Sequence, residues 1–136
     1  MRVNPYLYYN GDCEAAFKFY ESAIGGRIVA MMPYEGSPVV ADTPAEWRSK
    51  IMHGRMEIAG NVLMGGDAPP GRFVPQAGFS VSLNIDDPAE AERVYAALSE
   101  GGSVHMTLQE TFWAERFAMF ADKFGIPWMI NCEKTG

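Results

Sequence analysis

The chain has 136 residues, of which 48% are hydrophobic and 21% are charged, and its formal net charge is −6 at pH 7. This length suits one domain with a hydrophobic core, and the composition is that of an ordinary globular protein. The negative charge and the lack of a Lys/Arg cluster argue against a nucleic-acid partner, because phosphate binding requires a basic surface. No hydrophobic run is long enough to span a membrane, so we expect no membrane partner.

The cysteines and the N-terminus indicate the compartment. Cys13 and Cys132 lack the spacing of a metal or redox motif. The first residues lack the long hydrophobic stretch and the small-residue cleavage site of a signal peptide. We therefore expect reduced thiols and a cytoplasmic location. A disulfide between the two cysteines is the less favoured alternative.

The first elements are a strand and a helix. Residues Val3–Tyr9 are β-branched and aromatic, which predicts a strand. Asp12 is a suitable N-cap for a helix over Cys13–Ile24, whose hydrophobic residues recur at helical spacing. The glycines of Gly25–Gly26 then end this helix.

Three further strands follow before a linker. Arg27–Tyr34 is strand-like, and the proline- and glycine-containing residues Glu35–Ser49 are irregular. Lys50–Ala59 alternates in polarity and predicts a second strand, which a tight turn joins to a third at Val62–Met64. Residues 68–76 contain three prolines and one glycine, so we expect a linker there.

The order of elements repeats after the linker. It comprises a strand at Phe79–Ile85, a helix from Asp87-Pro88 to Glu100, a strand near Val104–Leu108 and a hairpin with its turn at Asp122–Gly125. This repetition predicts an α+β fold in which two βαβββ modules form a cupped, partly open mixed β-sheet. The first module spans about residues 1–67 and the second about residues 77–136.

The single helix of each module covers only one face of that module's sheet. Alternation places two hydrophobic sets under the helices: Phe79, Val81, Leu83 and Ile85, and Ile126, Trp128, Ile130 and Cys132. It directs polar candidates to the open, concave face: His53, Arg55, Glu57, Ser82, Asn84 and Asn131. A polar hollow suits a small polar ligand.

The polar group His53, Arg55 and Glu57 has two interpretations. The favoured one is a cross-strand ion pair beside a hydrogen-bonded histidine, because surface pairs of this kind are common. The alternative is a ligand site in which His53 is a general base and Arg55 holds a carboxylate or phosphonate.

Trp113 and Arg116 also have two interpretations. Trp113 is favoured as a plug of the core, and the alternative is the wall of a ligand mouth where Arg116 selects charge. Asp122 is expected to be a turn residue. Cys13 lies in the first turn of a helix, where the dipole could activate a thiol, but its place on the packed face favours an inert one.

Three segments carry a family resemblance: PYLYYNGDCEAAFKFY (Pro5–Tyr20), MHGRMEIAGNVLMGGD (Met52–Asp67) and QETFWAERFAMFADKFGIPWMINC (Gln109–Cys132). With the two βαβββ modules, they resemble the vicinal-oxygen-chelate superfamily of glyoxalase I, extradiol dioxygenases, and bleomycin- and fosfomycin-resistance proteins. The match is specific to its PhnB-like branch and covers essentially the whole chain. The resemblance implies a homodimer.

Enzymes of that superfamily hold a divalent metal, with His or Gln from the first strand of each module and Glu from the last. Here Val3–Tyr9 contains no such residue, Phe79–Ile85 offers only serines and an asparagine, and Met129 lies near the expected glutamate. Transition metals need imidazole, thiolate or carboxylate ligands. We therefore predict that the usual metal centre is absent and that no cofactor is evident.

The leading hypothesis is a protein that binds a small polar molecule in the concave sheet without the usual metal; whether it is an enzyme stays open. The alternative is a metal-dependent lyase, isomerase or dioxygenase with unconventional ligands such as His53 and Glu57. Methyl transfer is disfavoured, because no glycine-rich loop follows a strand and opens a helix.

Overall fold

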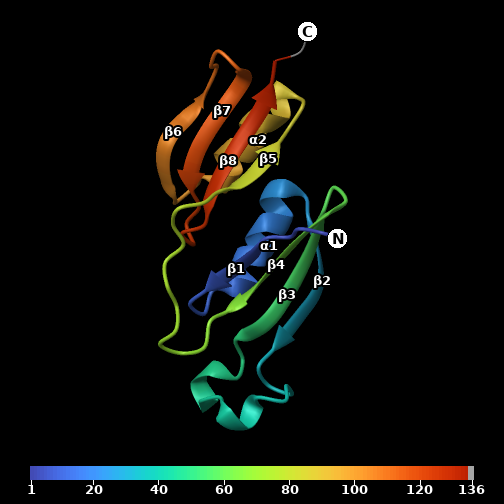
Figure 1. Cartoon of the computed structure of the whole chain (residues 1–136), viewed down its shortest axis with the longest axis vertical. Helices are drawn as coiled ribbons and strands as arrows, with labels where there is room; N and C mark the ends of the chain where they lie inside the picture. The colour runs from blue at the N-terminus through green and yellow to red at the C-terminus, as the bar shows by residue number, and fades with distance from the viewer. Residues whose placement is uncertain (135–136) are drawn as a thin grey trace. The chain divides into compact units, whose positions relative to one another are not determined.

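The structure is a computed structural model, and it describes residues 1–134. The chain divides into two compact units, Met1–Val74 and Pro75–Gly136, which are described separately below. Each unit has the order βαβββ and consists of a four-stranded sheet with one helix against it (Figure 1). The predicted α+β class with two βαβββ modules is confirmed.

Unit 1 has five regular elements and two 3₁₀ turns. They are β1 (Tyr6–Tyr9), α1 (Cys13–Ile24), β2 (Arg27–Pro33), η1 (Val40–Asp42), η2 (Ala45–Trp47), β3 (Ile51–Ile58) and β4 (Asn61–Asp67). The strand order is β1-β4-β3-β2, with β1 parallel to β4 and the other pairs antiparallel. Ala59 and Gly60, with φ of 47° and 82°, form the two-residue turn from β3 to β4. Positive φ at both positions matches the strand twist of a hairpin.

Unit 2 repeats this topology. Its elements are β5 (Val81–Asn84), α2 (Pro88–Leu98), β6 (Ser103–Gln109), β7 (Ala114–Ala121) and β8 (Pro127–Glu133). The strand order is β5-β8-β7-β6, and the one parallel pair is again the first strand with the last. Phe79 lies outside β5 and its side chain is 45% exposed, so its predicted place beneath the helix is wrong.

Each helix packs on one face of its own sheet. Helix α1 contacts β2, β3 and β4, and α2 contacts β7 and β8. In unit 1, Leu7 and Tyr9 of β1 are buried, whereas Tyr8 between them is 51% exposed. In unit 2, every second residue of β8 is buried, from Trp128 to Cys132, as the alternation predicted. We call the face opposite the helix the open face of each unit.

The buried carboxylate of Asp67 joins three segments of unit 1 at the end of β4. Its Oδ1 accepts the backbone N–H groups of Gly11 and Cys13 at 2.8 and 3.0 Å, and its Oδ2 accepts that of Ile51 at 2.8 Å. Asp12 occupies the predicted N-cap position of α1, but its side chain makes no capping hydrogen bond. A residue distant in sequence, and not the expected Asp12 side chain, therefore satisfies the first N–H of this helix.

Replacing Asp67 by Asn should destabilise the protein by roughly 2 kcal/mol, because one carboxylate oxygen becomes an amide donor facing a buried N–H group. The free energy of unfolding from urea denaturation measures the loss. Asp42→Asn is the matched control, since that side chain is exposed. Equal, small effects of the two substitutions would contradict the structural role of Asp67.

Candidate functional site

Tyr6 of β1 reaches across β4 to His53 of β3 on the open face of unit 1. Its hydroxyl lies 3.2 Å from His53 Nδ1 and 3.3 Å from the carbonyl oxygen of Met52, and the two rings stack with centroids 5.6 Å apart. The Tyr8 ring lies 5.0 Å from that of Tyr6. A side chain at position 66 would meet this hydroxyl and the Met52 backbone, so Gly66 makes the crossing possible. The two tyrosines thus place an aromatic surface beside the histidine.

Arg55 and Glu57 follow His53 on the same face but do not pair with each other. Glu57 pairs with Arg27 of β2 at 3.1 Å, and both side chains are exposed, so this ion pair adds little stability. Arg55 is half-buried, and its register partners are Ala30 and Met64. Within residues 1–134 it makes no ion pair or hydrogen bond through its side chain.

The favoured interpretation, a cross-strand ion pair beside a hydrogen-bonded histidine, is therefore confirmed for Glu57 and His53, but it does not account for Arg55. The histidine is hydrogen-bonded and the glutamate is ion-paired across strands, but the partner is Arg27, which leaves the Arg55 guanidinium available. A hollow of about 590 Å³ also lies in unit 1, lined by Arg2–Asn4, Glu57 and Gly60–Val62. Of the sequence-predicted residues, Glu57 lines it, whereas His53 and Arg55 do not.

The open face of unit 2 brings together Ser82, Asn84 and Asn131. Ser82 and Asn84 of β5 are exposed, and Asn131 Nδ2 of β8 donates to Asn84 Oδ1 at 3.3 Å. The other amide atom, Asn131 Oδ1, is buried and has no hydrogen-bond partner among the described residues. Met129 lies opposite Ser82 in the sheet, so the polar groups have a hydrophobic neighbour.

Trp113 lies beside this face without being a plug of the core. It is 45% exposed and packs edge-on against Phe117, with ring centroids 5.2 Å apart. Phe117 is the register partner of Asn131, so Trp113 packs against a direct neighbour of the Asn84–Asn131 amide pair. Phe112, 90% exposed, packs against Trp113 in turn.

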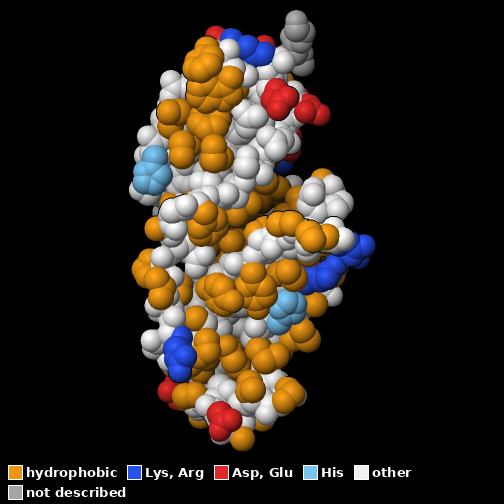
Figure 2. Space-filling model, in the orientation of Figure 1, with side chains coloured by type: hydrophobic (Ala, Val, Ile, Leu, Met, Phe, Trp, Pro, Cys, Tyr) orange, Lys and Arg blue, Asp and Glu red, His pale blue; other side chains and the backbone are white. Residues whose placement is uncertain are grey.

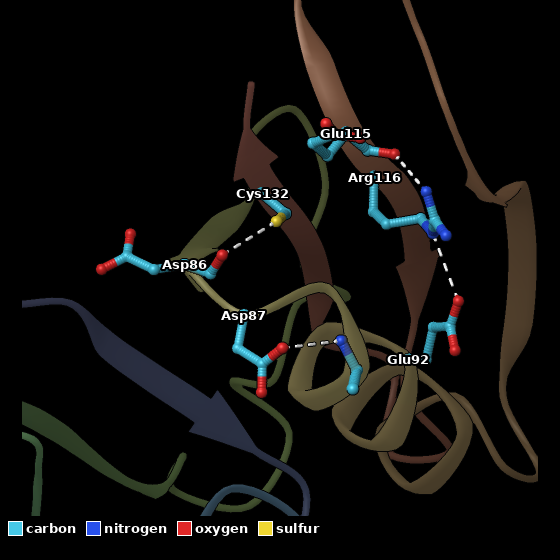
Figure 3. A network of polar contacts seen from close by, with 7 residues as sticks. Asp86, Asp87, Glu92, Glu115, Arg116 and Cys132 are labelled. Carbon is cyan, nitrogen blue, oxygen red and sulfur yellow. Dashed lines mark hydrogen bonds and ion pairs between the residues drawn. The ribbon is translucent and has the colours of Figure 1, made fainter. Parts of the chain in front are cut away.

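Arg116 lies on the opposite face of β7, toward α2. Its Nε donates to Glu92 Oε1 at 3.2 Å, and its Nη1 donates to the carbonyl oxygen of Glu115 at 2.7 Å (Figure 3). The figure also shows Asp87 accepting a backbone N–H at the start of α2, the predicted cap. Because Arg116 is held against the helix, the structure does not bring it together with the open-face residues of unit 2.

The two cysteines are free and buried, so the disulfide alternative is wrong. Burial raises the pKa of the Cys13 thiol strongly, and the nearby charge of Asp67 raises it further. Burial also raises the pKa of Cys132, whose Sγ donates to the carbonyl oxygen of Asp86 at 3.4 Å. The inert interpretation of Cys13 is thus supported over an activated thiol.

Asp122 is a turn residue, as predicted. Its Oδ1 accepts the backbone N–H groups of Phe124 and Ile126, and its Oδ2 accepts the indole N–H of Trp128 at 2.9 Å. These bonds close the loop between β7 and β8. The carboxylate is therefore used for structure rather than for acid–base chemistry.

The side chains do not fit the metal centre that the family resemblance implies. Within residues 1–134, no group of three or more His, Cys, Asp or Glu is placed to hold a metal ion. The open face of β1 offers Tyr6 and Tyr8. The unconventional candidates His53 and Glu57 are two ligands at most, and no third His, Cys, Asp or Glu joins them among the described residues. Hydroxyl and amide groups alone are poor ligands for a transition metal.

Sequence reasoning missed Tyr6, Tyr8, Gly66 and Asp67. The alternation of exposed and buried residues in β1 was a signal for the tyrosines, since Tyr6 and Tyr8 share one face. No local signal marks Gly66 or Asp67, because their roles depend on segments far away in the chain. No helix among the described residues has the length and apolar character needed to cross a membrane.

Both thiols should be unreactive in the folded protein at pH 8, since a raised pKa keeps them protonated and burial excludes the reagent. A colorimetric thiol assay should count close to zero groups without denaturant and two in guanidinium chloride. Cys13→Ser should lower the denatured count to one. Rapid reaction of one thiol under native conditions would contradict the inert interpretation.

Comparison with known proteins places this fold. Protein YjdN of Escherichia coli (strain K12) is 33% identical over 142 residues, covering 98% of this chain and 97% of YjdN. The crystal structure of protein PA1353 from Pseudomonas aeruginosa is 46% identical, with a TM-score of 0.88 and 99% of both chains covered. A PhnB protein from Bacillus cereus has a TM-score of 0.81 at 20% identity, over 97% of this chain and 99% of its own, a likeness of fold alone.

The sequence profile of one superfamily matches residues 2–130, nearly the whole chain. It agrees with the family resemblance of the sequence, and a PhnB protein is among the structural neighbours. The chain therefore belongs to the Glyoxalase/Bleomycin resistance protein/Dioxygenase superfamily.

Proposed function

We propose that the protein binds a small polar molecule with an anionic group on the open face of unit 1, and that Arg55 holds the anion. The single observation behind this proposal is the half-buried residue Arg55, whose guanidinium has no ion-pair or hydrogen-bond partner among the described residues. A partly desolvated charge gains from a counter-charge. A guanidinium forms paired hydrogen bonds with carboxylate or phosphonate groups.

The residues around Arg55 are suited to contact the uncharged, organic part of such a ligand. Met64 is its neighbour on β4, and the stacked rings of Tyr6 and His53 lie farther along the face. Figure 2 shows hydrophobic side chains gathered over the sheet of unit 1, with basic side chains beside them. A largely apolar surface with few polar groups is typical of small-molecule sites.

The open face of unit 2 is proposed as a separate candidate surface, with its own hydrogen-bonding groups: Ser82, Asn84 and Asn131. Trp113 would flank a ligand there. Arg116 is left out, because Glu92 holds it on the other face. A homodimer, implied by the family resemblance, and a cytoplasmic location, supported by the free thiols, complete the proposal.

The rival function is metal-dependent lyase, isomerase or dioxygenase chemistry, which would need His53 and Glu57 as ligands. Purified protein equilibrated with Zn²⁺, Mn²⁺ or Ni²⁺ and then desalted should retain less than one equivalent per chain by elemental analysis. The reason is that hydroxyl and amide groups complete no transition-metal site. One bound equivalent that is lost in His53→Ala would favour the rival.

A thermal-shift screen of small carboxylates and phosphonates tests binding. A true ligand at a hundredfold excess over its Kd stabilises the folded state by about 2.7 kcal/mol, so the melting temperature should rise by several degrees. Arg55→Met should abolish the shift by removing the charge while keeping the aliphatic stem. Arg116→Met is the matched control and should preserve the shift. A shift that survives Arg55→Met but not Arg116→Met would refute the assignment of Arg55.

A further inference from the structure

The hydroxyl of Tyr6 makes two contacts that only one arrangement of protons satisfies. It lies 3.3 Å from the carbonyl oxygen of Met52, which can only accept, and 3.2 Å from His53 Nδ1. A phenol carries one proton. If it donates that proton to Nδ1, the Met52 contact joins two acceptors and is repulsive. If it donates to Met52, His53 Nδ1–H can donate to the phenol oxygen, and both contacts are hydrogen bonds.

The neighbouring backbone holds the hydroxyl in this place. A Cβ added to Gly66 would lie 3.1 Å from the Tyr6 hydroxyl and 2.6 Å from the Met52 carbonyl oxygen. The missing side chain at position 66 is therefore what lets the tyrosine of β1 cross β4 and reach β3. The stacking of the two rings, with an interplanar angle of 29°, orients the imidazole in the same way.

The phenol keeps its proton under ordinary conditions. Burial raises the pKa of Tyr6, and the neighbouring Tyr8, Cys13 and Tyr34 raise it further. The neutral hydroxyl is therefore present at neutral pH and well into the alkaline range, so it can donate to Met52 throughout.

We infer that Tyr6 is a positioning residue that holds the imidazole of His53 with a proton on Nδ1, so that in the neutral ring Nε2 offers a lone pair to a ligand on the open face of unit 1. Among residues 1–134, no hydrogen-bond partner contacts Nε2. His53 and Arg55 are two residues apart on one strand face, so their Cα atoms are about 7 Å apart. This inference rests on the proposed function.

The pairing of a cation with a hydrogen-bond acceptor defines a ligand class. The ligand would place an anionic group on Arg55 and a hydroxyl that donates to His53 Nε2. A hydroxylated organic carboxylate or phosphonate has both groups, whereas a simple carboxylate has only the first. The nearby tyrosine rings favour an aromatic or apolar body on this molecule.

Nitrogen-15 NMR of the imidazole rings tests the proton arrangement without a ligand. The chain has two histidines, and His53→Gln identifies the His53 signals. At a pH where the ring is neutral, we expect a protonated Nδ1 and an unprotonated Nε2. Tyr6→Phe keeps the ring and should remove this preference, whereas Tyr8→Phe should leave it unchanged. A proton on Nε2 in the wild-type protein would overturn the inference.

Mandelate and phenylacetate, which differ in one hydroxyl group, test the ligand class by calorimetric titration. Wild-type protein should bind mandelate roughly fivefold more tightly, the usual net effect of one hydrogen bond. Tyr6→Phe should bring the two affinities together. Equal binding by the wild-type protein overturns this inference and leaves the proposed function standing. Binding of neither anion overturns the ligand class inferred here, whereas the proposed function is overturned only if the thermal-shift screen also finds no anion that depends on Arg55.

Discussion

One helix for each four-stranded sheet is the constraint on which this structure depends. A sheet has two faces, and α1 and α2 each cover one face of their own unit. Along β1 the consequence is a strict division, with Leu7 and Tyr9 packed beneath the helix while Tyr6 and Tyr8 lie on the open face. The face that is not needed for the core is then available for other chemistry, and the candidate residues other than Arg116 are found there.

The end of β4 both anchors unit 1 and shapes its open face. Asp67 ties this end to the first turn of α1 and to the start of β3 through three backbone N–H groups. The two preceding residues are glycines because other groups approach closely on both faces. A Cβ at Gly65 would lie 2.7 Å from the Leu7 carbonyl oxygen, and at Gly66 it would meet the Tyr6 hydroxyl. The same short segment thus holds the start of α1 through Asp67 and leaves room, at Gly66, for Tyr6 to reach His53.

The open faces carry a different chemistry from the metal centres of the superfamily's enzymes. The family resemblance implies imidazole and carboxylate ligands on the first and last strands of the modules, whereas the open faces of β1, β5 and β8 carry phenol, hydroxyl, amide and thioether groups. In unit 1 the strongest interaction still available is electrostatic and comes from the guanidinium of Arg55. Glu57, its nearest acidic neighbour along the strand, pairs with Arg27 instead. Under the proposed function, this surface binds its ligand through charge and hydrogen bonds, and the inferred proton arrangement of His53 gives that binding direction.

The sequence by itself determined the order of the elements, the bounds of α1, the cap of α2 and the hairpin turn at Asp122. These features follow from hydrophobic period and turn chemistry, which are local properties of the backbone. Only the tertiary structure decided which polar groups meet, because partner choice across strands depends on register and on which residues leave room. It set Glu57 against Arg27, held Arg116 on Glu92 and brought Tyr6 over Gly66 to His53.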